Sequence, residues 1–345
     1  MTDNMTTARQ YGAHVEREMR SILTPTRKAL SSLYGMMQYH MGWVDETFSP
    51  DHSYPGKLVR PTILLLVCDA VGGDWKAALP AAAAVELLHN FSLIHDDIED
   101  VSPTRRGRPT VWSLWGLAHA VNVGDIMYSY AYRAVSRLHG NGLSAETVHA
   151  TLRLLNQACI CLCEGQYLDL AFEGRVSVDM PLYLQMIEQK TASLIACAAE
   201  MGALIGGASP TVIQHYRRFG QQLGVGFQIM DDILGVWGDP TVTGKPTQDD
   251  LRARKKTFPV LHAMAVERDR GDSTLGDLYT EDEITDAQID RMLEALEKAG
   301  SHQHATEVLA DHRHKALQEL RATGMHNAAQ EALASLAASV LDRQY

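Results

Sequence analysis

The chain has 345 residues, of which 46% are hydrophobic and 21% are charged, and its formal net charge is −11. This composition is typical of one large or two modest globular domains. The acidic balance and the lack of a basic tract exclude the electrostatic footprint of a nucleic-acid-binding protein. The longest apolar runs are far too short for a transmembrane segment, and the N-terminus has no apolar signal core, so we expect a cytoplasmic location.

Helical periodicity dominates the chain. Apolar residues recur at three- and four-residue spacing, for example in segments 145–172 and 183–207, and no segment alternates convincingly as a strand. Breaks rich in Gly, Pro, Asn and Asp separate the helical segments. The sequence predicts one all-α domain over 1–345, with a polar helical part at about 270–345. Thr285 and Gln288 form a candidate capping box for the helix that follows them.

The segment LIHDDIEDVSPTRRGRPTVW follows an apolar run and carries four acidic residues. On a helix, Asp96, Asp97 and Asp100 are spaced by three and four residues, so their carboxylates crowd one sector. Carboxylates that repel one another in this way indicate a site for a cation. Mg²⁺ suits them, because it binds a few carboxylates, keeps several waters and bridges to phosphate oxygens.

A second acidic cluster lies in GFQIMDDILGVWGD, where Asp231 and Asp232 stand in another apolar helical run. A single buried acidic pair is also explained by a helix cap or an ion pair. Two clusters on separate apolar helices, each followed by basic residues, favour metal binding.

Basic residues stand beside the breaks and the acidic motifs. Each one alone is best read as a solvated surface charge. Together they predict a divided site for two anionic groups, one held through metal ions and the other held directly by Lys and Arg. The residues are Lys57, Arg60, Arg105, Arg106, Lys190, Lys245, Lys255 and Lys256.

The order of the motifs resembles the trans-isoprenyl diphosphate synthases, also called polyprenyl synthetases. The matching segments run from GKLVRP through ELLHNFSLIHDDIED, RRGRP, EGQYLDL, KTASL and FQIMDD to GKPTQDDLRARKKTFP, over residues 56–260 or so. The resemblance implies an antiparallel helix bundle around a central cavity, the isoprenoid synthase type I fold, in a homodimer. It also implies Mg²⁺, with three ions beside bound diphosphate.

The resemblance implies a reaction and assigns residues to it. Isopentenyl diphosphate is joined head-to-tail to an allylic diphosphate, which is dimethylallyl, geranyl or farnesyl diphosphate. Five aspartates are implied as metal ligands: Asp96, Asp97, Asp100, Asp231 and Asp232. Four residues are implied to bind isopentenyl diphosphate: Lys57, Arg60, His89 and Arg106. Six are implied to contact the allylic diphosphate: Arg105, Lys190, Thr191, Gln228, Lys245 and Lys255. Of these six, Lys190, Thr191, Gln228 and Lys245 are the catalytic candidates.

Product length is expected to depend on residues upstream of Asp96. Phe91 precedes it by five residues, or about 7.5 Å along a helix. Phe91 is bulky enough to close the cavity floor, Ser92 is small, and Leu88 lies another turn deeper. The resemblance then favours geranylgeranyl diphosphate (C20), with farnesyl diphosphate (C15) second. Simple core packing is the alternative role for Phe91.

The sequence departs from the family pattern at four positions. Gly235 stands where the family usually has a third aspartate, which is expected to weaken one metal contact, with Asp239 as a substitute through water. Trp112 replaces a usual His, and Gln248 and Arg254 occupy positions that are commonly Gly.

Two other functions remain open from the sequence. A class I terpene cyclase shares the fold, although a cyclase has no need of Lys57, Arg60 and His89. A non-catalytic or regulatory partner of a prenyltransferase assembly is conceivable because of Gly235. The HDD string alone also suggests a metal phosphohydrolase, but the additional His ligands of that chemistry are not evident.

Overall fold

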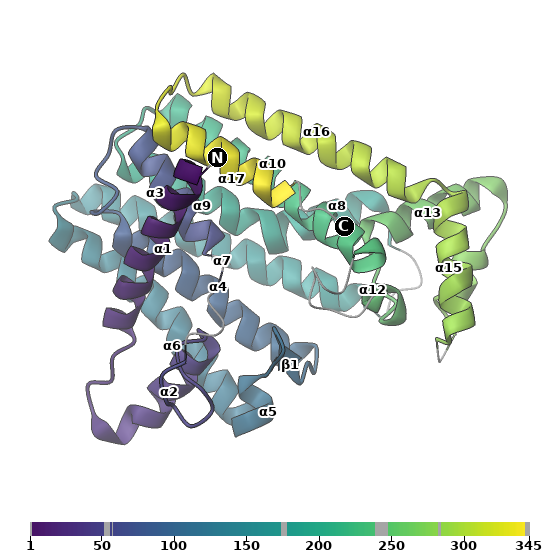
Figure 1. Ribbon diagram of the computed structural model, residues 1–345, viewed down its shortest axis with the longest axis horizontal. Coiled ribbons are helices and arrows are strands. Elements are labelled where there is room, and N and C mark those ends of the chain that lie inside the picture. Colours follow the sequence, from purple (N-terminus) through teal and green to yellow (C-terminus); the bar gives the residue numbers. More distant parts are fainter. Residues whose placement is uncertain are drawn as a thin grey trace. The chain divides into compact units, whose positions relative to one another are not determined.

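The computed structural model describes residues 2–51, 56, 58–173, 178–238, 248–281 and 284–341. In these ranges the chain is helical except for turns, loops, an isolated bridge between Val44 and Pro50, and a two-stranded hairpin of β1 (Thr104–Arg105) and β2 (Arg108–Pro109). The prediction of an all-α fold is confirmed (Figure 1). The hairpin was not predicted, because two residues per strand are too few for alternation to be visible.

The described chain forms two compact units, and each is discontinuous in sequence. Unit 1 comprises Met1–Cys159, Cys197–Tyr216 and Gly324–Leu333, and unit 2 comprises the remaining ranges Ile160–Ala196, Arg217–Thr323 and Ala334–Tyr345. The organisation as a single domain stays a prediction. No helix among the described residues is both long enough and apolar enough to cross a membrane.

Unit 1 is built around α4, which packs against α1, α3 and α6. Residues 63–68 of α3 and 81–85 of α4 are fully buried, so these two stretches are apolar on every side of the helix. The run of four alanines in α4 lets neighbouring helices approach its backbone closely. The helices wholly in this unit are α1 (Thr2–Ile22), η1 (Lys28–Leu30), α2 (Ser31–His40), α3 (Val59–Ala70), α4 (Leu79–Glu99), α5 (Val111–Trp115), α6 (Leu117–Ser136) and η2 (Arg137–Asn141).

Four helices contribute residues to both units: α7 (Ala145–Glu173), α9 (Ser193–Ile205), α10 (Pro210–Trp237) and α17 (Ala328–Leu341). The helices wholly in unit 2 are α8 (Met180–Ile187), the π-helical segment η3 (Glu188–Ala192), α12 (Asp249–Arg252), α13 (Phe258–Arg270), α14 (Thr274–Leu278), α15 (Asp286–Lys298) and α16 (Ser301–Ala322).

Unit 2 has its own apolar core. Leu251, Val260, Leu275, Met292 and Leu296 are among its buried members, and they come from α12, α13, α14 and α15. In Figure 1, α15 runs steeply across the end of α16, to which a short turn joins it. The predicted capping box at the start of α15 is confirmed: Thr285 and Gln288 each bond the backbone of the other.

Candidate active site

The first aspartate motif lies at the C-terminal end of α4. The helix ends at Glu99, and Asp100 is its C-cap residue. Asp97 is only 2% exposed, and burial raises its pKa to about 6, although the nearby Arg105 guanidinium lowers it in part. The C-terminal end of a helix carries partial negative charge, so carboxylates there are destabilising unless a cation lies close. The end of α4 is therefore suited to receive positive charge.

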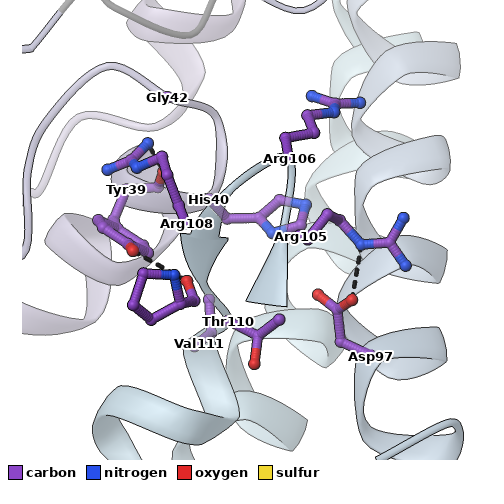
Figure 2. A pocket seen from close by; sticks show the side chains of 10 residues that line it. Tyr39, His40, Gly42, Asp97, Arg105, Arg106, Arg108, Thr110 and Val111 are labelled. Atoms are coloured by element: carbon purple, nitrogen blue, oxygen red, sulfur yellow. Dashed lines mark hydrogen bonds and ion pairs between the residues drawn. The ribbon is translucent and has the colours of Figure 1, made fainter. Parts of the chain in front are cut away.

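Arg105 supplies positive charge in this structure. Its Nη2 donates to Oδ2 of Asp96 at 2.8 Å, and its Nε donates to Oδ1 of Asp97 at 2.6 Å. One guanidinium thus bridges two carboxylates on adjacent residues, and Figure 2 shows its contact with Asp97. The planar fork of Arg suits this geometry, whereas the single ammonium of Lys does not.

The β1–β2 hairpin positions Arg105 and Arg106. Arg106 and Gly107 form the loop between the paired residues Arg105 and Arg108, with φ of 53° and 74°. Two consecutive residues with positive φ are typical of a two-residue hairpin turn, in which glycine is favoured and a long side chain is unusual. Arg106 therefore holds a strained backbone conformation beside the candidate site, where strain is often retained for function.

Arg60 and His89 form a basic pair in the same unit. Arg60 Nη1 lies 3.2 Å from His89 Nε2, and Arg60 Nε is buried without a hydrogen-bond partner among the residues that the structure describes. Burial, followed by the charges of Arg60, Arg106 and other basic neighbours, lowers the pKa of His89 well below its usual value. His89 is thus neutral and accepts from Arg60 at neutral pH. These groups have more donors than acceptors, which suits an anion.

A cavity beside the hairpin joins the acidic and basic residues. Asp97, Arg105, Arg106, Arg108 and His40 are among its lining residues (Figure 2). Burial together with the three arginines lowers the pKa of the buried His40 to about 3, although a side-chain hydrogen bond with Asn90 raises it in part. Arg106 also lines a second cavity, between residues of α1, α4 and the segment before α3.

The residues predicted to set product length lie on α4. Leu88 is fully buried, and Phe91 is 8% exposed. The Phe91 ring makes edge contacts with His95 and Tyr128, with centroids 5.4 Å apart in both pairs. Ser92 Oγ donates to the His89 carbonyl oxygen at 2.8 Å.

The second aspartate motif lies in unit 2, on α10. Asp231 is exposed, whereas Asp232 is 5% exposed. Asp232 Oδ2 accepts from the Tyr183 hydroxyl and, at 2.8 Å, from the Phe258 backbone N–H, while Oδ1 accepts from Gln228 Nε2 at 3.1 Å. Burial raises the pKa of Asp232 to about 7 despite these three donors. Among the described residues, the hydrogen-bond donors to this carboxylate are all neutral.

Gln228 connects Asp232 to Thr191. Gln228 Oε1 accepts from Thr191 Oγ1 at 2.8 Å. The next residue, Lys190, forms an ion pair with Asp169 of α7. The structure therefore brings together three of the predicted catalytic residues, Lys190, Thr191 and Gln228, with Asp169 and Tyr183 as additional partners.

Lys190 and Thr191 belong to η3, where the helix widens to π geometry. A Cβ on Gly165 would lie 2.2 Å from Lys190 N, and a Cβ on Gly224 would lie 2.4 Å from Ala192 Cα. The two glycines thus allow α7 and α10 to approach the backbone of η3 closely. π-helical bulges of this kind are frequent at functional sites.

The space beside Gly235, where the family usually has a third aspartate, is filled by a carboxylate from another helix. A Cβ built on Gly235 would lie 1.8 Å from Oδ2 of Asp250, which comes from α12. Asp250 also raises the pKa of Asp232 through its negative charge. The expected substitute, Asp239, lies outside the described residues, as do Lys57 and Lys245.

The other departures have structural counterparts. Trp112 Nε1 donates to the Ser102 carbonyl oxygen at 2.8 Å and so ties the end of α4 to α5. Gln248 and Arg254 have φ of 65° and 53°, in the left-handed region that favours glycine. Lys256 donates to the Phe172 carbonyl oxygen at 2.7 Å, and Lys255 also belongs to unit 2.

The carboxylates fit Mg²⁺ as a partner of bound diphosphate. Within the described ranges, no three His, Cys, Asp or Glu side chains form a ready cage for a metal ion. Mg²⁺ rarely uses such a cage and is usually bound by one or two carboxylates, waters and substrate phosphates. Carboxylate oxygens suited to this kind of binding are present on Asp96 and Asp97, which both pair with the Arg105 guanidinium. They are also present on the exposed Asp231. The metal roles of all five aspartates stay predictions.

Comparison with known proteins identifies the class first. A polyprenyl synthetase from Streptomyces coelicolor A3(2) superposes with a TM-score of 0.89 at 31% identity, over 98% of this chain and all of the other. A geranylgeranyl pyrophosphate synthetase from Pyrococcus horikoshii gives 0.88 at 31% identity, over 99% of each chain. The fold is the all-α isoprenoid synthase fold.

Sequence comparison then gives the family. The polyprenyl synthetase model matches residues 42–296. A (2E,6E)-farnesyl diphosphate synthase from Mycobacterium tuberculosis is 36% identical over 94% of this chain and 91% of its own. A geranylgeranyl diphosphate synthase from the same species is 40% identical over 83% and 80%. The chain belongs to the polyprenyl synthetase family and is a prenyltransferase of the isoprenyl diphosphate synthase class.

Sequence reasoning missed four residues that the structure places among the candidates: His40, Asp169, Tyr183 and Asp250. Asp169 and Asp250 lie within segments that carried the family resemblance. Asp169 was a candidate for the acidic partner of Lys190, and Asp250 was a candidate for the carboxylate that is missing at Gly235. His40 and Tyr183 give no local signal, because a lone His or Tyr in an apolar helix is ordinarily part of the core.

Proposed function

We propose that this prenyltransferase condenses isopentenyl diphosphate head-to-tail with an allylic diphosphate, in a Mg²⁺-dependent reaction in the cytoplasm. The allylic substrate is dimethylallyl, geranyl or farnesyl diphosphate. The product is a short trans-prenyl diphosphate, with C20 favoured and C15 second. Relatives of both product lengths support the short-chain assignment.

The observation that carries the proposal is the spacing along α4 of an acidic pair and of His89, which contacts the cationic Arg60 of α3. The basic pair of His89 and Arg60 and the acidic pair of Asp96 and Asp97 are two helical turns apart, or about 10 Å along the axis. A basic group can hold one diphosphate directly, and the acidic group can hold another through metal ions. The joining of two diphosphate esters requires both kinds of binding on neighbouring groups.

The residues present fit the steps of this reaction. Asp96, Asp97 and Asp231 would hold Mg²⁺, which supplies Lewis-acid stabilisation of the diphosphate leaving group. Lys57, Arg60, His89 and Arg106 bind the diphosphate of isopentenyl diphosphate and orient its double bond. Lys190, Lys245 and Lys255 bind the allylic diphosphate, and Thr191 and Gln228 offer oxygen atoms to the developing allylic cation. The proton that is lost after bond formation goes to the departing diphosphate.

The test is incubation of the purified chain with Mg²⁺, isopentenyl diphosphate and allylic primers of increasing length. A chain-elongated diphosphate is the expected product. Formation of a hydrocarbon from a prenyl diphosphate alone would identify a terpene cyclase instead. A chain that is folded but inactive with every primer would favour a non-catalytic partner.

Arg60→Ala tests the basic group separately. We expect the Michaelis constant for isopentenyl diphosphate to rise about tenfold or more, with a smaller change for the primer, because a charge-assisted contact to one substrate is lost. Arg137→Ala, which removes a partly exposed ion pair with Glu18, is the matched control. An unchanged Michaelis constant in Arg60→Ala would contradict the assignment.

Product length is proposed to depend on Phe91. Its buried ring, braced by His95 and Tyr128, can close the space in which the chain grows. Phe91→Ala should shift products beyond C20, and Leu88→Ala should extend them further in combination, whereas Phe91→Tyr should retain the original length. If Phe91→Ala makes the wild-type products at comparable turnover, Phe91 is core packing only.

We also propose a homodimer. Leu114, Leu117 and Val121 are exposed apolar residues near the start of α6, with exposures of 38%, 58% and 40%. Exposed apolar surface of this kind is costly in water unless it is covered. Light scattering should show a dimer that Val121→Glu weakens, whereas Val101→Glu, which changes another exposed apolar residue, should not. A wild-type monomer would contradict the proposal.

A further inference from the structure

We propose that Tyr183 is a positioning residue which, through Asp232 and Gln228, fixes the direction of the Thr191 hydroxyl and keeps its lone pairs available to positive charge on the substrate. The inference rests on the proposed prenyl transfer, in which such charge develops on the allylic group. It assigns Tyr183 a role that its place in a buried core does not suggest, and it separates the role of Asp232 from that of Asp231.

We call the hydrogen-bonded chain Tyr183–Asp232–Gln228–Thr191 the relay. It begins with two donors to one carboxylate oxygen. The Tyr183 hydroxyl and the Phe258 backbone N–H both donate to Asp232 Oδ2. Tyr183 is fully buried, and its ring also makes an edge contact with Phe258, with centroids 6.2 Å apart. An oxygen that accepts from two donors is held as an acceptor, which leaves the second oxygen, Oδ1, facing Gln228.

The remaining directions follow from the chemistry of each group. In the ionised form of Asp232 both oxygens accept, so Gln228 turns its Nε2 donor towards Oδ1, at 3.1 Å. Its Oε1 then faces Thr191, and the Thr191 hydroxyl donates to it at 2.8 Å. The proton of Thr191 is thus committed to Gln228, and the lone pairs of Thr191 Oγ1 are not used by this relay.

The backbone holds Thr191 in place for this bond. Thr191 lies in the π-helical η3, and Gly224 on α10 lets the backbones of α10 and η3 come close one helical turn before Gln228. Buried hydrogen-bond networks of this kind can specify one arrangement, provided that every member is satisfied. Removal of the first donor should therefore loosen the last one.

The direction matters because a cation distinguishes the two faces of a hydroxyl. If Gln228 were reversed, its Nε2 would donate to Thr191, and the hydroxyl proton would be directed elsewhere. A proton directed at an allylic cation would destabilise it, whereas a lone pair stabilises it. The relay should therefore affect a charged ligand more than an uncharged ligand of the same shape.

The experiment measures that difference without turnover. Calorimetry gives the affinities of a prenyl trialkylammonium compound and of its uncharged carbon isostere, each with Mg²⁺ and inorganic diphosphate. The variants are Tyr183→Phe, Asp232→Asn and the matched control Tyr216→Phe, which removes a buried hydroxyl that bonds Gln330 at 2.7 Å. We expect the ratio of charged to uncharged affinity to fall about tenfold in Tyr183→Phe, the equivalent of one lost hydrogen bond, and to stay unchanged in the control.

Two results would overturn the proposal. The first is a ratio in Tyr183→Phe within about twofold of wild type. The second is an equal loss of affinity for both compounds, which would show that Tyr183 is only structural. In a Thr191→Val background, Tyr183→Phe should have no further effect on the ratio, and an undiminished effect there would also count against the relay.

Asp232→Asn keeps the proposal testable if Tyr183→Phe fails to fold. The Asn amide retains the shape but places an N–H₂ donor opposite Gln228, which must then rotate and donate to Thr191. The ratio should fall as in Tyr183→Phe, while the thermal shift produced by Mg²⁺ with diphosphate is kept. Loss of that shift would assign Asp232 to the metal and overturn the inference, as would an unchanged ratio.

Failure of the proposed function gives a different pattern. If the wild type elongates no primer but binds the charged compound with a preference that depends on Tyr183, the prenyl transfer proposal fails and the relay stands. If the wild type elongates primers and its charge preference is independent of Tyr183, the relay fails and prenyl transfer stands.

Discussion

Both aspartate motifs begin with a pair of adjacent aspartates, but the two pairs are held in different ways. At the end of α4, Asp96 and Asp97 share the guanidinium of Arg105. On α10, Asp232 accepts from a tyrosine, a backbone N–H and a glutamine side chain, all of them neutral. One motif is balanced by a cation, and the other by hydrogen bonds.

The difference indicates which carboxylates can exchange partners. A cation can replace another cation, so Asp96 and Asp97 would be able to hold Mg²⁺ in place of Arg105, whose guanidinium would then be available to the substrate phosphates. Three neutral donors cannot be replaced together without leaving buried polar groups unpaired. Asp232 should therefore keep its partners during the reaction, and we expect the exposed Asp231 to be the residue of this pair that would hold a metal ion.

The largest effect is expected at Asp97. Asp97→Asn keeps the shape and an acceptor for Arg105 but removes the charge that supports the departing diphosphate. Turnover should fall about 10³-fold, because the contact strengthens as charge develops on the leaving group. Steady-state kinetics measure it, with Asp125→Asn, an exposed carboxylate on α6, as the control. A loss in Asp97→Asn no larger than in the control would remove Asp97 from the site.

The second effect is ligand-linked stability. Mg²⁺ with inorganic diphosphate at about 100 dissociation constants should raise the free energy of unfolding by about 2.7 kcal/mol. Thermal melts of wild type, Asp96→Ala, Asp231→Ala and the double variant show whether each motif contributes. If the double variant shows the same shift as wild type, neither aspartate binds the metal.

A smaller effect is expected at Gly235, where the structure changes the expectation drawn from the sequence. A side chain added there meets the Asp250 carboxylate, so Gly235→Asp brings two negative charges to one place. It should raise the Mg²⁺ concentration needed for half-maximal rate a few-fold, because the added side chain fills the space of the Asp250 carboxylate and displaces that carboxylate from its position.

The double variant Gly235→Asp/Asp250→Ala tests whether the effect of Gly235→Asp depends on Asp250. It moves the carboxylate from α12 to α10 and should restore the wild-type Mg²⁺ requirement. If Gly235→Asp alone lowers that requirement, the added carboxylate binds the metal directly and Asp250 is not its equivalent.

The sequence predicted the all-α fold and the positions of both motifs, because helical periodicity and acidic spacing are local patterns. It could not predict the contrast between the motifs. The partner of Asp96 and Asp97 lies in a hairpin too short to be recognised, and Tyr183 lies 49 residues from Asp232 in the chain. Contacts of this kind depend on how distant segments pack, and a single sequence does not contain that information.

The departures at glycine positions show the same limit on a smaller scale. Gln248 and Arg254 stood out only because the family commonly has Gly there. The structure gives the physical reason, since both residues adopt positive φ. A left-handed backbone costs an ordinary L-residue about 1–2 kcal/mol. The positions are therefore strained with the residues that this chain has.

The smallest predicted effect follows from that strain. Gln248 caps the start of α12 through its backbone carbonyl, which accepts from Leu251 and Arg252, and the substitution Gln248→Gly would keep both bonds. The relief of strain, less the entropy that glycine loses on folding, should stabilise the protein by about 0.5–1 kcal/mol. Gln318→Gly, in the interior of α16, should instead cost about 1 kcal/mol because its φ is already helical. Urea unfolding of both variants measures the difference, and a loss of stability in Gln248→Gly equal to that in Gln318→Gly would show that no strain is stored at residue 248.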